Sequence, residues 1–335
     1  MEQKIQEKTT YTLEIKNLKT QFFTSKGVVP AVDDVTIEIP KGKIIGVVGE
    51  SGCGKSMTAM SVMQLLRHPG KIVDGSIKLD GKELIGISAK EMRNIRGNEI
   101  SMIFQEPMTS LNPVYTVGHQ VREAILLHQN LSKQEAKDKV IDIFRQVGIP
   151  EPEKRYNSYP HQLSGGLRQR VMIGMAMVCE PKLLIADEPT TALDVTIEAQ
   201  ILNLMKKLRD EHGTSILLIT HNMGVVAEVC DYVYVMYAGK VMEEAETFEL
   251  FEHTSHPYTQ GLLKSIPQLN LSADRLYSIR GIVPNLLHLP KGCSFCTRCD
   301  YADERCKVNR PEHYSVGNEH KVRCFRCERG QTASE

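Results

Sequence analysis

The chain has 335 residues, which is enough for one large domain with a substantial core and a smaller appendage. Its 41 lysine and arginine residues balance its 41 aspartate and glutamate residues, whereas a nucleic-acid binder ordinarily carries a basic excess. The first ten residues lack the apolar segment of a signal peptide, and apolar runs such as 171–178 and 215–220 are too short to span a bilayer. We therefore expect a soluble protein, without nucleic acid as a partner, that acts at a membrane only through another subunit.

The first part of the chain has the pattern of β-strands. In residues 31–39, apolar side chains alternate with polar ones, which is the period of a half-buried strand. Residues 43–49 are almost continuously apolar and end in glycine, as expected for a parallel strand that is buried on both faces. We expect a helix from Lys55 and a hairpin over residues 75–84 that turns at Asp80-Gly81.

From about residue 107 to about residue 170 the pattern is mostly helical. Ser132 and Glu135 form a capping box at the start of one helix, and Gly148 ends it. Further on, the apolar runs 182–187 and 215–220 predict strands, separated by a helix that stops at Gly213. Residues 232–245 predict a closing hairpin, and beyond about residue 255 the sequence is irregular and rich in proline and cysteine. The fold class is α/β with a helical insert.

The segment Gly49–Ser56, GESGCGKS, matches the phosphate-loop pattern between a buried strand and a helix. Its glycines allow backbone amides to wrap a phosphate, and the helix N-terminus adds positive potential. Lys55 is expected to reach the β- and γ-phosphates, and the Ser56 hydroxyl to coordinate Mg²⁺. The alternative is a glycine-rich turn that matches by chance.

A pair of carboxylates follows the predicted strand at 182–187. Asp187 stands at the strand end, where it can hold the hydration shell of Mg²⁺, and Glu188 comes next, where it can activate a water. An acidic helix start after a strand is the plain alternative. Earlier, at 163–169, LSGGLRQ places Ser164 and two glycines ahead of a helix, an arrangement that suits anion binding by backbone amides.

In this order, the motifs resemble those of the ATP-binding-cassette (ABC) ATPases over about residues 11–255. The resemblance implies a P-loop NTPase fold with an antiparallel β subdomain, a helical subdomain at about 107–170, and a cassette domain over 1–255. It also implies that residues 163–169 are the signature motif, which contacts the nucleotide of a partner cassette. The catalytic residues it implies are Glu188, His221 as the switch histidine, and Gln105 of the Q-loop.

The same resemblance assigns the nucleotide contacts one by one. Phe22 matches the aromatic residue that stacks on adenine, with Phe23 beside it as the alternative, and Asp194 matches the aspartate at the dimer seam. The expected ligands of Mg²⁺ are Ser56, Gln105 and Asp187. The full set that we expect at the ATP site is Phe22, Gly49, Glu50, Ser51, Gly52, Cys53, Gly54, Lys55, Ser56, Met57, Gln105, Ser164, Gly165, Gly166, Gln169, Asp187 and Asp194.

Within this family, residues 24–32, 102–113, 256–263 and 281–293 resemble the cassettes of the oligopeptide/dipeptide importers, a group that also serves nickel. The resemblance implies a subunit on the cytoplasmic face of the cell membrane. Its partners would be a second ABC ATPase subunit, identical or related, two permease subunits and an extracytoplasmic substrate-binding protein. The alternatives are the same importer with nickel or another small solute as cargo, and a non-transport cassette acting on DNA or ribosomes.

Six of the nine cysteines crowd into the extension over 256–335, where clustered thiols in a reducing compartment favour metal over disulfide. The importers with such a tail have been associated with a [4Fe–4S] cluster, and the matching ligands are Cys293, Cys299, Cys306 and Cys324. Two further cysteines leave a zinc-ribbon set open, in which Cys296 and Cys299 pair with Cys324 and Cys327. An unmetallated tail that only packs on the cassette is the third alternative.

Overall fold

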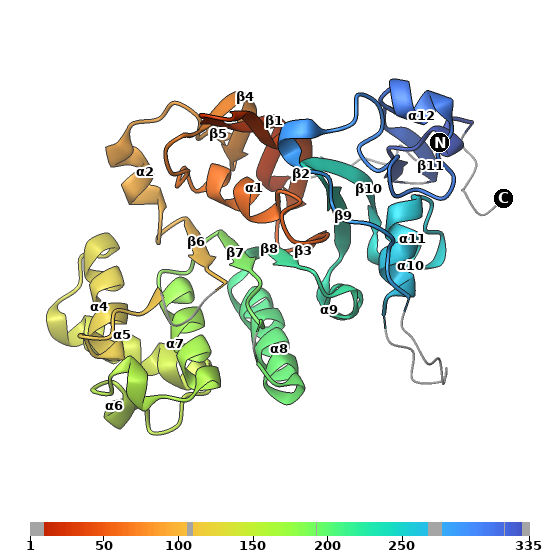
Figure 1. The fold of residues 1–335 in the computed structure, drawn as a ribbon. Coiled ribbons are helices and arrows are strands. Elements are labelled where there is room, and N and C mark those ends of the chain that lie inside the picture. The colour runs from red at the N-terminus through yellow and green to blue at the C-terminus, as the bar shows by residue number, and fades with distance from the viewer. Residues whose placement is uncertain (1–9, 106–109, 192, 267–276, 318, 330–335) are drawn as a thin grey trace, which may run out of the picture.

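The computed structural model describes residues 10–105, 110–191, 193–266, 277–317 and 319–329. Within them the chain forms two sheets flanked by helices (Figure 1). The smaller sheet is antiparallel, and its strands run in the order β2 (Gly27–Pro40), β1 (Tyr11–Thr24), β4 (Gly70–Leu79) and β5 (Lys82–Glu83).

The larger sheet has eight strands and is mixed. Its order is β11 (Tyr314–Gly317), β12 (His320–Val322), β10 (Lys240–Glu246), β9 (Tyr232–Tyr237), β3 (Ile44–Val48), β8 (Ser215–Thr220), β7 (Leu183–Asp187) and β6 (Ile100–Ile103). The five strands from β9 to β6 are parallel, and the three outer strands join them antiparallel. Strands β3, β7 and β8 are buried along their whole length. The sequence predicted this burial for β3, and it predicted strands at β7 and β8.

Helices of different lengths connect the strands. The α-helices are α1 (Lys55–Val62), α2 (Ala89–Ile95), α4 (Val117–His128), α5 (Lys133–Gln146), α6 (Pro152–Arg155), α7 (Gly165–Met177), α8 (Val195–His212), α9 (Met223–Val229), α10 (Thr247–Glu252), α11 (Pro257–Lys264) and α12 (Glu304–Val308). Short 3₁₀ turns lie at Pro160–Gln162, Leu286–His288 and Phe325–Cys327. Within the described residues, no helix combines the length and the apolar character needed to cross a membrane.

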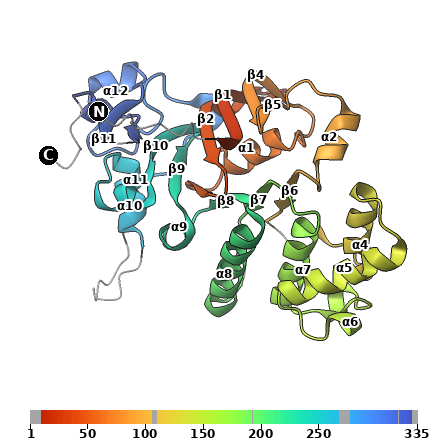
Figure 2. The ribbon, with the colours of Figure 1, turned by 180° about the vertical axis from the view of Figure 1, so that it is seen from behind.

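Apolar side chains fill both faces of the large sheet. One core lies between the two sheets around α1, and a second joins the opposite face to helices α4, α5, α7 and α8. Helices α4 to α7 lie at one end of the molecule and the cysteine-rich extension at the other, as both views show (Figures 1 and 2). The start of the predicted helical insert, about residue 107, falls outside the described residues.

Local signals in the sequence predicted several element ends. The chain turns at Asp80 (φ 45°) and Gly81 (φ 79°), between β4 and β5. Ser132 and Glu135 form the expected capping box of α5, and α8 ends at Gly213 (φ 68°). The expectation of an irregular tail was incomplete, because β11 and β12 pair with each other and β12 pairs with β10, which extends the cassette's own sheet.

Candidate nucleotide-binding site

The glycine-rich loop runs from the end of β3 to the start of α1, and its shape requires glycine at particular positions. Gly49 has φ 149°, and a Cβ atom there would lie 2.1 Å from the carbonyl oxygen of Met236. Gly54 has φ 107°, and its Cβ would lie 2.5 Å from the carbonyl oxygen of Ala31. Both positions combine a left-handed backbone with direct contact to another strand, so a side chain would displace the loop.

The residues of this loop differ in their exposure to solvent. Ser51 and Gly52 are exposed, whereas Cys53 is fully buried, and burial raises the pKa of its thiol. The ammonium of Lys55 is buried and donates to the carbonyl oxygens of Gly49 (2.7 Å) and Glu50 (3.1 Å). The lysine is therefore held against the backbone of the loop that it follows.

Two oxygen donors suited to Mg²⁺ meet beside the loop. The Ser56 hydroxyl donates to Oδ1 of Asp187 across 3.1 Å, although the two residues are 131 positions apart in sequence. Asp187 is only 5% exposed, and this burial raises the pKa of its carboxyl group, against the lowering effect of the Ser56 hydrogen bond. Met57, the next residue of α1, is half-buried.

Glu188 lies where the carboxyl ends of β6, β7 and β8 meet. Its carboxylate accepts hydrogen bonds from Gln105 Nε2 (3.0 Å) and Thr191 Oγ1 (2.9 Å). His221, which follows β8, places Nδ1 3.2 Å from the other carboxylate oxygen. Burial acts to raise the pKa of Glu188, but the bonds from His221 and Thr191 outweigh it and hold that pKa below the ordinary value. The carboxylate is therefore charged and oriented.

The structure brings Gln105 and His221 to Glu188 because their strands are neighbours in a parallel sheet, whose carboxyl ends share one edge. The sequence had not singled out Thr191. The signal that was available is a hydroxyl three residues after the carboxylate, on the turn that leads toward α8.

Residues 164–166 form the start of α7. The Ser164 hydroxyl caps the helix by accepting from the Leu167 amide (3.4 Å). A Cβ at Gly166 would lie 3.1 Å from Ile197 on α8, whose N-terminus is capped by Asp194. The N-termini of α7 and α8 thus lie side by side, and the missing side chain of Gly166 allows the two helix starts to approach closely.

Gln169 and Phe22 have partners within the chain. Gln169 is buried on α7, and its Nε2 donates to the carbonyl oxygen of Pro189 (2.5 Å), the residue after Glu188. A Cβ at Gly70 would lie 2.7 Å from the Phe22 ring, which therefore packs against this backbone, while Phe23 is 46% exposed. Gln169 connects the start of α7 to the loop that carries Glu188.

Five tail cysteines line one cavity. They are Cys293, Cys296, Cys299, Cys306 and Cys324. Cys327 is fully buried and is not among the lining residues; a hydrogen bond between Cys324 and Cys327 lowers the pKa of Cys324. Across the residues that the structure describes, no three histidine, cysteine, aspartate or glutamate side chains gather closely enough to hold a single metal ion.

The fold and this edge of the sheet define an ABC-type ATPase. A family model described as ABC transporter matches residues 32–191. A second model, the C-terminal region of oligopeptide/dipeptide transporters, matches residues 242–306.

Close relatives extend the match to more than nine-tenths of the chain. The oligopeptide transport ATP-binding protein AppD of Bacillus subtilis is 52% identical over 314 residues, which covers 93% of this chain and 96% of the relative. The dipeptide transport ATP-binding protein DppD of Haemophilus influenzae is 45% identical over 312 residues, or 93% and 94% of the two chains. This chain belongs to the ATP-binding subunits of the oligopeptide/dipeptide family of ABC transporters.

Solved structures agree with the cassette fold. The ATP-binding cassette MJ0796, described as a dimer in a post-hydrolysis state bound to ADP and Pi, superposes with a TM-score of 0.64 at 26% identity. The match covers 70% of this chain and 98% of that one. The protein cbiO1 of Clostridium perfringens superposes with a TM-score of 0.62 at 29% identity and covers 72% and 91% of the two chains.

Proposed function

We propose that this chain hydrolyses ATP at the site around Glu188 and thereby powers peptide import through a membrane transporter. The observation that carries this proposal is the carboxylate of Glu188, oriented by Gln105, Thr191 and His221 next to the Ser56–Asp187 pair. A charged, oriented carboxylate of this kind can accept a proton from an attacking water. Lys55 and the amides of residues 49–57 would bind the phosphates.

Ser56, Asp187 and Gln105 would hold Mg²⁺. The hydroxyl and carboxylate oxygens that meet at 3.1 Å fit this hard cation, which prefers oxygen ligands. When bound, Mg²⁺ would neutralise charge on the phosphates. His221 would contact the γ-phosphate from the side of β8, and Phe22 would stack on adenine.

The start of α7 would serve the nucleotide of a second cassette. Ser164, Gly165 and Gly166 would present backbone amides to the γ-phosphate held by that partner, with Asp194 at the seam. Gln169 of the same motif is a further proposed nucleotide contact. The dimeric state of the solved cassette bound to ADP and Pi supports this arrangement. Closure of two cassettes on ATP and reopening after hydrolysis would form a two-state device that drives the permease.

The remaining proposals concern the division of the chain and its partners. We propose a cassette over about residues 1–255, with its helical subdomain at about 107–170, and an extension over 256–335. The subunit would sit on the cytoplasmic face of the membrane with a second ATPase, two permease subunits and an extracytoplasmic binding protein. The oligopeptide and dipeptide transport names of the relatives favour peptides over nickel as cargo.

The test uses the transporter purified from membranes with its own partners and reconstituted in liposomes. Peptides supplied with the binding protein should stimulate ATP turnover, and Lys55→Ala should abolish that stimulation and weaken nucleotide binding. Stimulation by nickel but not by peptides would overturn the cargo assignment. Co-purification with ribosomes or DNA instead of integral membrane proteins would overturn the transport role.

We also propose that Cys293, Cys299, Cys306 and Cys324 hold a [4Fe–4S] cluster, because all four line the same cavity. The rival zinc set needs Cys327, which does not line that cavity. A zinc ion also requires four ligand atoms in one coordination sphere. A cluster interposes iron and sulfide atoms between its four thiolates, so its ligands lie farther apart. The cluster would hold the small extension together.

Anaerobically purified protein tests the assignment by metal analysis and its visible absorption spectrum. We expect about four iron and four sulfide per chain, which is the content of one [4Fe–4S] cluster. Cys306→Ser should lose the iron, whereas Cys296→Ser, on the same cavity but outside the ligand set, should keep it. One zinc per chain, lost in Cys296→Ser and Cys327→Ser, would contradict the cluster.

A further inference from the structure

The extension reaches the glycine-rich loop through one arginine. Arg298 donates from both terminal nitrogens to the Glu50 carboxylate, at 2.5 Å and 3.0 Å. The Arg298 side chain is 3% exposed and that of Glu50 is 29% exposed. Two parallel, charge-assisted hydrogen bonds with one partner buried are the strong form of this pairing, unlike an exposed surface ion pair.

Arg298 is itself held by its surroundings. Its Nε donates to the carbonyl oxygen of Arg280 (2.8 Å), and the guanidinium lies 5.8 Å from the ring centre of Tyr237 and 6.0 Å from that of Phe295. Its own amide donates to the carbonyl oxygen of Phe295 (3.0 Å), which fixes the turn between the tail cysteines. The guanidinium is therefore presented to Glu50 in a fixed position.

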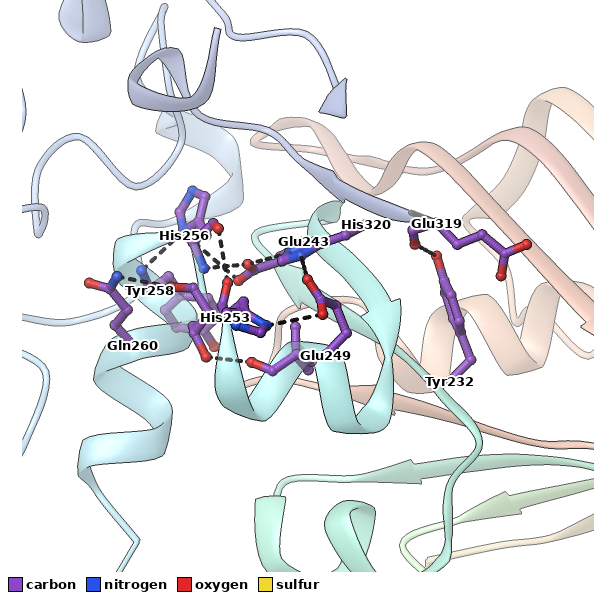
Figure 3. Close-up of polar contacts among 12 residues, drawn as sticks. Tyr232, Glu243, Glu249, His253, His256, Tyr258, Gln260, Glu319 and His320 are labelled. Atoms are coloured by element: carbon purple, nitrogen blue, oxygen red, sulfur yellow. Dashed lines mark hydrogen bonds and ion pairs between the residues drawn. The ribbon is translucent and has the colours of Figure 1, made fainter. Parts of the chain in front are cut away.

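The backbone of Glu50 is held from the same side. Its amide donates to the hydroxyl of Tyr258 (2.9 Å), a buried residue of α11 that is drawn in Figure 3. The ring centre of Tyr258 lies 5.3 Å from that of Phe295. Two residues beyond 255, Arg298 and Tyr258, thus hydrogen-bond to the side chain and the backbone amide of Glu50.

The carbonyl of Glu50 is one of two that accept hydrogen bonds from Lys55 Nζ. A shift of Glu50 would move this carbonyl and, with it, the ammonium expected to bind phosphate. Because Gly49 lies against the Met236 carbonyl, the loop has little room to rearrange without changing its shape. The grip on Glu50 therefore bears directly on the position of Lys55.

We propose that Arg298 is a positioning residue for the phosphate loop: by clamping Glu50, the cysteine-rich extension sets the affinity of this chain for ATP. The inference rests on the nucleotide site proposed above. It makes the extension part of the ATP site in function, beyond any role in stapling the tail.

The test measures ATP affinity, KM for ATP and kcat in the purified transporter with Arg298→Ala, Glu50→Ala and the double variant. Each single change should weaken ATP binding about tenfold, which corresponds to ~1.4 kcal/mol. The loss should appear in KM far more than in kcat. Since both variants remove the same interaction, the double variant should be no weaker than either single one.

Arg305→Ala is the matched control. Arg305 is also a tail arginine paired with a carboxylate, but its partner Glu328 belongs to the tail and not to the glycine-rich loop, so its loss should leave ATP affinity unchanged. Glu50→Ala changes no residue of the extension, so it stays informative even if Arg298→Ala disturbs the tail.

Wild-type affinity in Glu50→Ala, or losses that add in the double variant, would overturn the proposal. Lys55→Ala distinguishes failure of the proposed nucleotide site from failure of the proposed role of Arg298. If Lys55→Ala and Glu50→Ala both bind ATP normally, the nucleotide site is wrong. If Lys55→Ala loses ATP binding and Glu50→Ala does not, only the role of Arg298 is wrong.

Discussion

At the scale of single residues, the proposed chemistry depends on the orientation of the Glu188 side chain. Its backbone has φ 49°, a left-handed conformation that is uncommon outside glycine, and its amide donates to the Ile219 carbonyl of β8 (2.8 Å). Backbone and side chain are thus both fixed to neighbouring strands. Such backbone strain at a candidate catalytic carboxylate is typical of functional sites, where the position of a side chain is fixed at a cost in conformational energy.

Replacing Glu188 with glutamine should separate binding from hydrolysis. The substitution keeps the shape of the side chain but removes the proton acceptor, so we expect turnover to fall by about 10²- to 10⁴-fold. ATP affinity should remain within about threefold of wild type, because Lys55 and the loop amides are untouched. Equilibrium nucleotide binding and steady-state ATPase assays check this, and full turnover in the variant would remove Glu188 from its role.

Site residues could be predicted from sequence where a motif names them, and not where only the fold unites them. The glycine loop and the pair at 187–188 were recognisable because their spacing reflects phosphate and metal chemistry. Thr191 and Arg298 carry no such spacing. Arg298 meets Glu50 across 248 positions, and no local pattern encodes a contact of that range.

At the scale of elements, the extension is joined to the cassette by a sheet and by a buried polar cluster. Figure 3 shows this cluster around Glu243 of β10. The Glu243 carboxylate accepts from the amides of Ser255 (2.7 Å) and His256 (3.2 Å) and lies 3.0 Å from Nε2 of His320. Because β12 carries His320, one carboxylate connects the tail hairpin, the start of α11 and the central sheet.

The same contrast between local and distant signals applies to elements. The capping box of α5 and the turn at Asp80-Gly81 lie within a few residues of sequence and were predictable. The pairing of Glu243 with Val322, between β10 and β12, was not, because a three-residue strand such as 320–322 has no periodicity to detect. Its place is set by the partner strand.

His320 gives the docked extension a pH dependence. Burial lowers its pKa, but bonds to Glu243 and Glu249 outweigh burial and raise that pKa above the ordinary value. Glu249 also bonds to His253, while burial lowers the pKa of His256 to about 3, so His256 stays neutral. A group with a raised folded-state pKa stabilises fully below its unfolded pKa, about 6.5 for histidine, and this contribution is lost as pH rises through the folded value.

We therefore expect the extension to become easier to undock as pH rises above about 6.5. Limited proteolysis at pH values below and above about 6.5 should show faster cleavage within residues 277–329 at the higher pH. His320→Gln should be cleaved faster at low pH and lose the pH dependence. His253→Gln, which removes an exposed histidine from the same Glu249, should keep it, and a flat profile in the wild type would contradict the sign.

At the scale of the whole molecule, two parts lie at opposite ends. Helices α4 to α7 form one end, and the cysteine-rich extension forms the other (Figures 1 and 2). The proposed ATP site lies on the sheet between them. Gln105, which follows β6, contacts Glu188, and Arg298 of the tail contacts Glu50. Gln105 therefore acts on the carboxylate of Glu188, and Arg298 acts on the glycine-rich loop through Glu50.

The central claim is that ATP hydrolysed around Glu188 drives peptide entry, and uptake of a labelled peptide tests it most directly. Cells from which the gene for this chain has been deleted would receive either the wild-type gene or the Glu188→Gln variant, matched for protein in the membrane fraction. The account predicts that the wild type restores uptake and that the variant restores almost none. Full uptake with the variant, or no peptide uptake with the wild type, would contradict it.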